Sequence, residues 1–464
     1  MSTNTLQENK MGVMSEGKLL LNMALPMIAS MLVQALYNVV DSVFVSQISE
    51  SAVTALSLAF PIQNMQIGFA VGIGVGVNSL LSKSLGEKNQ EGANRAAGNG
   101  LILMLIITAV FMLFGFFGVR PYYEMQSDVR ETVEGGIVYS QICCVFTVGV
   151  FLSILGERLL QSTGRTFYTM ITQSTGAIIN IILDPIFIFG LKMGVAGAAV
   201  ATIIGQFCGC ALAIYFNHKK NTDITLSLRG FRPNWRLIGE IYAIGVPSII
   251  MVCIGSVMTF CMNKILIAYT AGKETAATVF GVYFKLNSFI FMPVFGLNNG
   301  VIPIVAYNYG ARNKHRMLHA IKLSATFACG VMIIGMLIFL SVPGLLLSLF
   351  DASAQMLSIG EPALRIISTS FAFAGVCIAL GSVFQALGRG TYSMIVSFVR
   401  QLVVLVPCAY LLARWGLSIG NNDLVWLSYP IAEVFSLAVT LILFTRLYRK
   451  VIAPMEDSGA AVHG

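Results

Sequence analysis

Long apolar runs separated by short polar segments dominate this chain. A helix that crosses a bilayer needs about 20 mostly apolar residues, and the runs reach that length. The pattern predicts an all-α polytopic membrane protein with twelve transmembrane helices. The predicted spans are residues 19–46, 53–82, 98–119, 135–157, 169–190, 195–216, 242–268, 277–306, 320–342, 360–383, 391–412 and 424–446.

The overall composition supports a membrane protein. Hydrophobic residues make up 56% of the chain and charged residues 11%, with a mean hydropathy of +0.80. A soluble domain carries about 25% charged residues, so this composition argues against a soluble enzyme. The first apolar run is too long for a signal peptide and lacks a cleavage site of small residues, so we expect it to remain as a membrane helix.

The positive charges predict how the chain is oriented. The net charge is +8, but the cations gather in every second connection instead of forming a surface for nucleic acid. Since cytoplasmic loops of membrane proteins are enriched in Lys and Arg, both termini are predicted to be cytoplasmic. The cation-rich connections carry Lys83, Lys88, Arg95, Arg158, Arg165, Lys219, Lys220, Arg229, Arg232, Arg236, Arg312, Lys314, Arg316, Lys322, Arg389, Arg446, Arg449 and Lys450, and the opposite set carries Arg120, Arg130, Lys192, Lys273 and Arg414.

The two halves of the chain resemble each other. Residues 161–165 (QSTGR) recur as residues 385–389 (QALGR), Pro26 in span 1 matches Pro247 in span 7, and Gly86 matches Gly310. Six spans in each copy predict a parallel repeat, as in alternating-access transporters: two pseudo-symmetric six-helix lobes around a central cavity. The predicted divisions are a cytoplasmic N-terminal segment (1–18), an N-lobe (19–216), a cytoplasmic inter-lobe loop (217–241), a C-lobe (242–446) and a cytoplasmic C-terminal tail (447–464).

Two aspartates lie inside predicted spans. Asp41 is in span 1 and Asp184 in span 5, each a few residues from the predicted outer end. A carboxylate inside a membrane helix costs several kcal/mol, so such residues usually face a protein interior or a watery cavity and mark ion or substrate paths. The alternative is that each aspartate only forms a hydrogen bond between helices.

Three further polar residues are predicted to share the depth of these aspartates. Asn180 lies one helical turn before Asp184, Tyr139 is in span 4, and Thr202 is in span 6. Oxygen ligands suit a hard cation, and paired carboxylates out of water suit proton exchange. The predicted cation-coupling residues are Asp41, Asn180, Asp184, Thr202 and Tyr139, with Asp41, Asn180, Asp184 and Thr202 as ligands if the ion is Na⁺; the residues permit either H⁺ or Na⁺.

The second half does not repeat this chemistry. It contains Lys285 in span 8 and Glu433 in span 12 at similar predicted depth. We hypothesise that they form an ion pair in the second-half cavity; the alternative is two unrelated groups that each face water. Gln34 and Tyr37 on span 1 are further candidates for the substrate cavity.

Other motifs favour structure over chemistry. Residues 72–76 (GIGVG) imitate a nucleotide-binding loop, but they lie inside a span and have no preceding strand, so close helix packing is the better interpretation. No histidine lies firmly in a span and no Cys/His cluster exists in the sequence. We therefore expect neither an enzyme nor a cofactor beyond the coupling ion.

Several stretches together resemble the multidrug and toxic compound extrusion (MATE) family, in its prokaryotic branch with a first-lobe cation site. They are residues 25–26 (LP), 36–41 (LYNVVD), 161–165 (QSTGR), 180–185 (NIILDP), 291–296 (FMPVFG) and 307–310 (YNYG). The resemblance implies a first-lobe cation site at Asp41, Asn180, Asp184 and Thr202, with Tyr139 nearby. One branch of the family also carries acidic residues in spans 7 and 10, and we expect none in this chain at 246–268 or 365–384.

The resemblance also implies a function. We expect a secondary active antiporter in the plasma membrane of a prokaryote that exports cationic or amphipathic drugs in exchange for H⁺ or Na⁺ by alternating access. The alternative is a flippase or exporter of a lipid-linked saccharide or another metabolite. The expected partners are small organic cations or amphipathic drugs and membrane lipids, with no nucleic acid, and the protein is expected to be a monomer.

Overall fold

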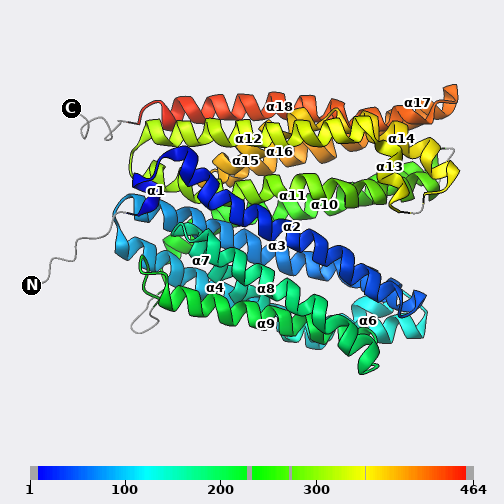
Figure 1. Ribbon diagram of the computed structural model, residues 1–464, viewed down its shortest axis with the longest axis horizontal. Helices are drawn as coiled ribbons and strands as arrows, with labels where there is room; N and C mark the ends of the chain where they lie inside the picture. The colour runs from blue at the N-terminus through cyan, green and yellow to red at the C-terminus, as the bar shows by residue number, and fades with distance from the viewer. Residues whose placement is uncertain (1–8, 227–232, 271–273, 351, 456–464) are drawn as a thin grey trace, which may run out of the picture.

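The described part of the chain is built from helices packed side by side. A computed structural model describes residues 9–226, 233–270, 274–350 and 352–455, and no strand occurs among them. The helices run along the long axis of the molecule, with those of the first half in the lower part of the view and those of the second half in the upper part (Figure 1). Residues 1–8 and 456–464 of the two terminal segments, together with Arg229, Arg232 and Lys273, lie outside the described residues.

The helices of the first half are α1 (Lys10–Val13), α2 (Glu16–Ser46), α3 (Glu50–Gly86), α4 (Gln90–Phe117), α5 (Val119–Glu124), α6 (Arg130–Val145), α7 (Val148–Ser162), α8 (Thr166–Pro185), the π-helix η1 (Ile186–Gly190) and α9 (Val195–Lys219). Those of the second half are α10 (Trp235–Tyr269), α11 (Glu274–Gly310), α12 (Lys314–Ser341), α13 (Pro343–Ser348), α14 (Ala354–Ser368), α15 (Phe371–Ala386), α16 (Gly390–Phe398), η2 (Val399–Leu405), α17 (Val406–Ile419), η3 (Asn422–Leu427), α18 (Ser428–Leu447) and η4 (Tyr448–Ile452).

The prediction of twelve spans is confirmed in number, and two of the spans are bent. Within the described residues, ten helices are long and apolar enough to cross a membrane, and two bent helix pairs bring the total to twelve. The pairs are α6 with α7, bent by 46°, and α14 with α15, bent by 50°. They correspond to the predicted spans 135–157 and 360–383, at equivalent places in the two halves.

Backbone conformation supports the internal repeat. Gly164 and Gly388, which match in the repeated motif, both have positive φ, at 83° and 73°. Lys88 and Arg312 also correspond, and they have φ of 56° and 54°. Because a non-glycine residue rarely adopts positive φ, its recurrence at matching positions indicates that both halves use the same turns.

Glycine allows the two halves to approach closely. A Cβ atom added to Gly72 would lie 2.7 Å from the carbonyl oxygen of Gly245, and one on Gly76 would lie 2.5 Å from that of Ile241. These contacts join α3 to α10. The segment 72–76 is therefore a helix-packing segment, as interpreted from the sequence.

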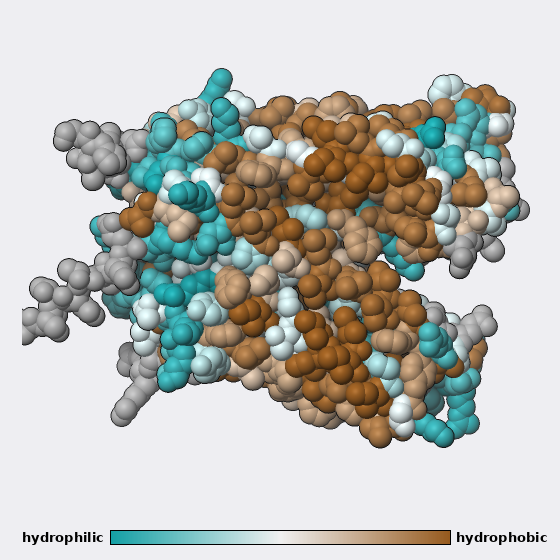
Figure 2. All heavy atoms as spheres, in the orientation of Figure 1, coloured by the Kyte–Doolittle hydropathy of each residue, from teal (hydrophilic) through white to brown (hydrophobic). Residues whose placement is uncertain are grey.

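The two halves separate at the end opposite the termini. The space-filling view in Figure 2 shows an apolar belt between polar ends, and a cleft that enters between the halves at the end where α6 and α17 lie. The other end, where both termini lie, shows no such opening in this view. The closed end coincides with the glycine-mediated contacts between α3 and α10.

A short helix before the first span packs into the closed end. The Met11 side chain on α1 has no exposed surface, and its backbone oxygen accepts a hydrogen bond from Asn308 of the second half at 3.4 Å. Asn9 donates to the backbone oxygen of Thr163 of the first half at 3.1 Å. Burial, together with the neighbouring Arg165 guanidinium, lowers the pKa of the Lys10 ammonium. The polar sequence of this segment did not predict that it would contact both halves.

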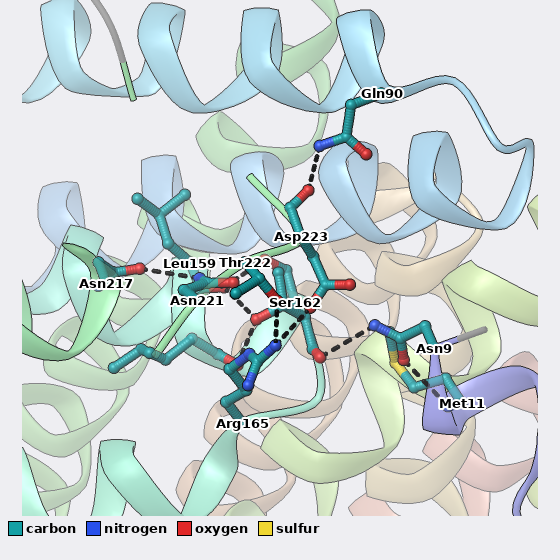
Figure 3. A network of polar contacts seen from close by, with 12 residues as sticks. Asn9, Met11, Gln90, Leu159, Ser162, Arg165, Asn217, Asn221, Thr222 and Asp223 are labelled. Atoms are coloured by element: carbon teal, nitrogen blue, oxygen red, sulfur yellow. Dashed lines mark hydrogen bonds and ion pairs between the residues drawn. The ribbon is translucent and has the colours of Figure 1, made fainter. Parts of the chain in front are cut away.

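An ion pair and hydrogen bonds hold the connection between the two halves against the closed end. Figure 3 shows Arg165 directed at Asp223, whose carboxylate accepts from the Arg165 guanidinium at 2.9 Å. Thr222 accepts a second hydrogen bond from that guanidinium at 3.0 Å, and the Gln90 amide donates to the Asp223 backbone oxygen. The part of the predicted loop 217–241 that the structure describes is therefore held against α4 and the start of α8.

We predict that Met11→Ala lowers the melting temperature of the purified protein. Truncating a fully buried methionine leaves a cavity and typically costs about 2–5 kcal/mol. The matched control is Val13→Ala on the same helix, where the side chain is 56% exposed. Thermal unfolding in detergent measures both variants, and equal melting temperatures would contradict the packing described for α1.

Candidate cation site

The two predicted aspartates meet between α2 and α8. Asp184 has no exposed surface. The Asp41 carboxyl group lies within hydrogen-bonding reach of the Asp184 carboxyl group, so a proton between them would join the two. Two buried carboxylates in contact repel each other, so the pair is most stable when it shares a proton or holds a cation.

Asn180 and Thr202 complete one side of the pair. With the Asn180 amide oriented to suit both neighbours, its nitrogen donates to Asp184 Oδ2 at 2.7 Å and its oxygen accepts from the Thr202 backbone N–H at 3.0 Å. The Thr202 hydroxyl donates to the backbone oxygen of Ala198 at 2.9 Å. One helical turn between Asn180 and Asp184 puts both on the face of α8 that packs against α9.

Two tyrosines also lie near the carboxyl pair. Tyr37, one turn before Asp41 on α2, interacts with both carboxyl groups and forms a side-chain hydrogen bond with Thr202. Tyr139 on α6 is buried, interacts electrostatically with Asp41, and accepts a hydrogen bond from the Gln63 amide at 2.9 Å. The structure therefore places Tyr37, predicted for the substrate cavity, with the cation-coupling residues, and it adds Gln63 of α3.

The arrangement suits a small hard cation or a proton. Asp184 Oδ1 is buried and accepts no hydrogen bond from a neighbouring N–H or hydroxyl donor, so no such donor competes there with an ion or a shared proton. The neighbouring ligands are oxygens of a second carboxyl group, an amide and hydroxyls, which hard cations prefer. No group of three or more His, Cys, Asp or Glu side chains suited to a metal occurs within the described ranges, so the carboxyl pair is the charged part of the site.

The hypothesis of an ion pair between Lys285 and Glu433 is wrong. Glu433 is buried on α18, and its carboxylate accepts from the Arg400 guanidinium at 2.9 Å. Lys285 is exposed, and its ammonium lies 5.9 Å from the centre of the Phe350 ring. Similar predicted depth had favoured Lys285, but the packing of η2 against α18 brings Arg400 to the carboxylate.

Aromatic side chains surround this second ion pair. Tyr283 on α11 interacts with both Glu433 and Arg400, and its ring lies 5.8 Å from that of Tyr429. Glu433 Oε2 and the Tyr429 hydroxyl are buried and have no hydrogen-bond partner. The Gln34 amide donates to Asn38 at 3.4 Å, and its place in the substrate cavity stays a prediction.

A second buried charge pair was missed in the first half. Arg158, counted from the sequence among the loop cations, lies inside α7 beside Glu157, and both are buried. The signal available in the sequence was that apolar residues flank both sides of the pair. The predicted span ended at residue 157, although α7 continues to Ser162.

A protein-family model matches both halves of this chain. The model named MatE matches residues 26–186 and 247–411, one stretch in each half of the chain. The chain belongs to the MatE family. This is the multidrug and toxic compound extrusion family that the sequence motifs resemble.

The relatives of this MatE protein are transporters. It is 28% identical over 426 residues to "Multidrug export protein MepA" of Staphylococcus haemolyticus (strain JCSC1435), covering 90% of each chain. It is 25% identical over 453 residues to "FAD transporter" of Shewanella oneidensis, covering 95% of this chain and 97% of the relative. A solved structure described as the outward-facing conformation of a multidrug resistance MATE family transporter superposes with a TM-score of 0.90 at 25% identity, covering 97% of this chain and 99% of that one.

The expectation of no acidic residue at 246–268 and 365–384 agrees with the sequence of both stretches. The helices of the structure begin before these stretches. In this MatE protein α10 begins at Trp235 and includes Glu240, which forms an ion pair with Arg236 at 3.6 Å. The bent span 10 begins at Ala354 and includes Glu361, at the start of the predicted span 360–383.

We predict that Arg400→Gln destabilises this MatE protein by roughly 3–5 kcal/mol, because it leaves the buried Glu433 carboxylate without a charge partner. The double variant Arg400→Gln, Glu433→Gln is expected to regain most of that loss, since neither charge remains. Thermal unfolding of the two single variants and the double variant measures the coupling. Lys285→Gln is the matched control, and an effect of that variant as large as that of Arg400→Gln would contradict the pairing.

Proposed function

We propose that this MatE protein is a secondary active antiporter that exports cationic or amphipathic organic compounds in exchange for H⁺ or Na⁺ by alternating access. The carrying observation is the contact between the buried Asp184 carboxyl group and the half-buried Asp41 carboxyl group, a pair that can bind and release one positive charge. The relative from Staphylococcus haemolyticus, named a multidrug export protein, supports organic drugs as the exported class.

The proposed orientation places both termini in the cytoplasm. Lys and Arg are concentrated in the connections on the side of the termini, and both termini lie at the same end of the molecule (Figure 1). In this orientation the cleft of Figure 2 opens to the outside. The superposition with a transporter described as outward-facing supports this assignment of the conformation.

Exchange follows if ion and drug favour different conformations. A ligand shifts a conformational equilibrium only to the extent that it binds the two states with different affinity. The carboxyl pair touches α2, α6, α8 and α9, so its charge affects how these helices pack together. We propose that an ion entering from outside neutralises the pair, weakens its attraction for a cationic drug, and so releases the drug into the open cleft.

The geometry of the helices also leads to proposals about lipid contact, oligomeric state and cofactors. The exposed apolar belt in Figure 2 is proposed to contact membrane lipid. We propose that a monomer is sufficient for transport, because α2, α3, α6, α8 and α9 of one chain supply the residues described around the carboxyl pair. No resident cofactor is needed, because an ion gradient supplies the free energy for export.

A second candidate is export of an anionic or other metabolite. The relative from Shewanella oneidensis, named an FAD transporter, covers 95% of this chain. The buried Arg158 and the half-buried Arg400 could contact an anionic substrate or the phosphate of a lipid-linked saccharide. Comparing efflux of a lipophilic cation with efflux of a flavin nucleotide separates these candidates.

We predict that Asp41→Asn and Asp184→Asn each reduce efflux of a fluorescent lipophilic cation to the level of cells without a pump. Each variant removes one carboxylate from the pair, so binding an ion no longer changes the charge in the same way. Efflux is measured in cells lacking their own pumps, and the H⁺ and Na⁺ gradients are collapsed separately. The gradient whose collapse stops wild-type efflux identifies the coupling ion.

The matched control for this experiment is Glu240→Gln, which neutralises an acidic side chain on the surface of α10. It is expected to transport at the wild-type rate. Full efflux by both aspartate variants would show that the carboxyl pair does not couple the ion. Wild-type cells that export the flavin nucleotide but not the cation would favour the second candidate.

A further inference from the structure

The buried charges of α7 point in different directions. The Glu157 carboxylate accepts from the Gln173 amide of α8 at 2.8 Å and from the Ser153 hydroxyl at 3.2 Å. Adjacent residues of a helix project about 100° apart, and Arg158 instead extends toward α11. The carboxylate nearest in sequence therefore does not form a hydrogen bond with this guanidinium.

Arg158 is held by neutral groups only. Its Nη1 atom donates to Gln161 Oε1 at 2.9 Å and to Asn299 Oδ1 at 2.9 Å. Gln161 belongs to α7 in the first half and Asn299 to α11 in the second half. Within the described residues, no carboxylate lies within 4.0 Å of this buried guanidinium. The adjacent Glu157 carboxylate interacts with it electrostatically from beyond that distance.

Two further donors lie on the same helix interface. Gln161 Nε2 and Asn78 Nδ2 are buried and have no hydrogen-bond partner, and both side chains have no exposed surface. Asn78 lies on α3 one turn after Gly74, and a Cβ added to Gly74 would be 2.8 Å from Arg158 Cγ. The Ser82 hydroxyl, one turn further along, bridges Asn78 Oδ1 and the Ser162 backbone oxygen.

The unsatisfied atoms of Gln161 and Asn78 are both donors. An unpaired buried donor costs about 1–3 kcal/mol. Water could satisfy the two amides, but it would add no negative charge within 4.0 Å of Arg158, whose interaction with Glu157 acts from a longer distance. A small anion supplies both the missing acceptor and a negative charge at close range.

We propose that the junction of α3, α7 and α11 binds a small monovalent anion through Arg158, Gln161 and Asn78. This site is separate from the proposed exchange of drug and ion at the first-half carboxyl pair, and its ligand has the opposite charge. Chloride and the carboxylate of a transported compound share the required acceptor chemistry. The full burial of both amides restricts the ligand to the size of a halide or a single carboxylate group. Because Arg158 bonds Asn299 across the two halves, the bound anion stabilises the closed end of the cleft.

The test is thermal unfolding of the purified protein in nanodiscs with sodium chloride, sodium acetate or sodium gluconate at equal concentration. Ligand binding to the folded state stabilises it in proportion to ln(1 + [L]/Kd). Chloride or acetate is expected to raise the melting temperature of wild type by roughly 2 °C in a saturable manner relative to gluconate, because gluconate is too large for the site. A response to chloride assigns a free ion, and a response to acetate alone assigns a substrate carboxylate.

Variants locate the site. Gln161→Glu puts a carboxylate beside Arg158, so this variant is expected to lose the anion response and to be at least as stable in gluconate as wild type in chloride. Arg158→Gln is expected to lose the anion response as well. If Arg158→Gln does not fold, the response of Gln161→Glu is sufficient to test the proposed site. Gln385→Glu, the same change at the matching position of the second repeat, is expected to respond like wild type.

Two results would overturn the proposal. Equal melting temperatures of wild type in all three salts would mean that these donors bind water only. An anion response that persists in Gln161→Glu would place the binding elsewhere in the molecule.

Discussion

The free-energy cost of removing a charged side chain from water constrains how the helices of this protein pack. Lipid offers no hydrogen bonds, so a charged side chain inside a span must find a partner within the protein or face a watery cavity. Asp184 is covered by Asn180 and Asp41, and Glu433 by Arg400. The contact between Asp41 and Asp184 joins α2 to α8, and that between Arg400 and Glu433 joins η2 to α18, so these polar residues help to determine which helices are neighbours.

Close backbone packing provides the complementary constraint. Gly72 and Gly76 let α3 lie directly against α10, and larger side chains there would separate the halves. These contacts, together with α1 and the ion pair between Arg165 and Asp223, lie toward the end that bears the termini. The cleft at the other end is free to open because the halves are joined at one end only. Alternating access in such a molecule requires that these closed-end contacts separate while others form.

The carboxyl pair and the closed end are linked through α2 and α8. α2 carries Asp41, and its first turn carries Glu16, which forms an ion pair with Arg316 of the second half at 3.7 Å. α8 carries Asp184 and begins directly after Arg165, which holds the loop between the halves. A change of charge at the pair therefore acts on two helices whose opposite ends contribute to the closed end.

The sequence by itself determined the number of spans, the repeat, the family and the two aspartates, because hydropathy and motif spacing are local properties of the chain. Depth in the membrane also follows from the sequence, and it brought Asp41, Asn180, Asp184 and Thr202 to one level. Only the tertiary structure decided lateral neighbours: Arg400 instead of Lys285 beside Glu433, Tyr37 beside the carboxyl pair, and Arg158 inside α7. The physical reason is that position along a helix sets depth, whereas the partner at that depth depends on how each helix is rotated and bent against the others.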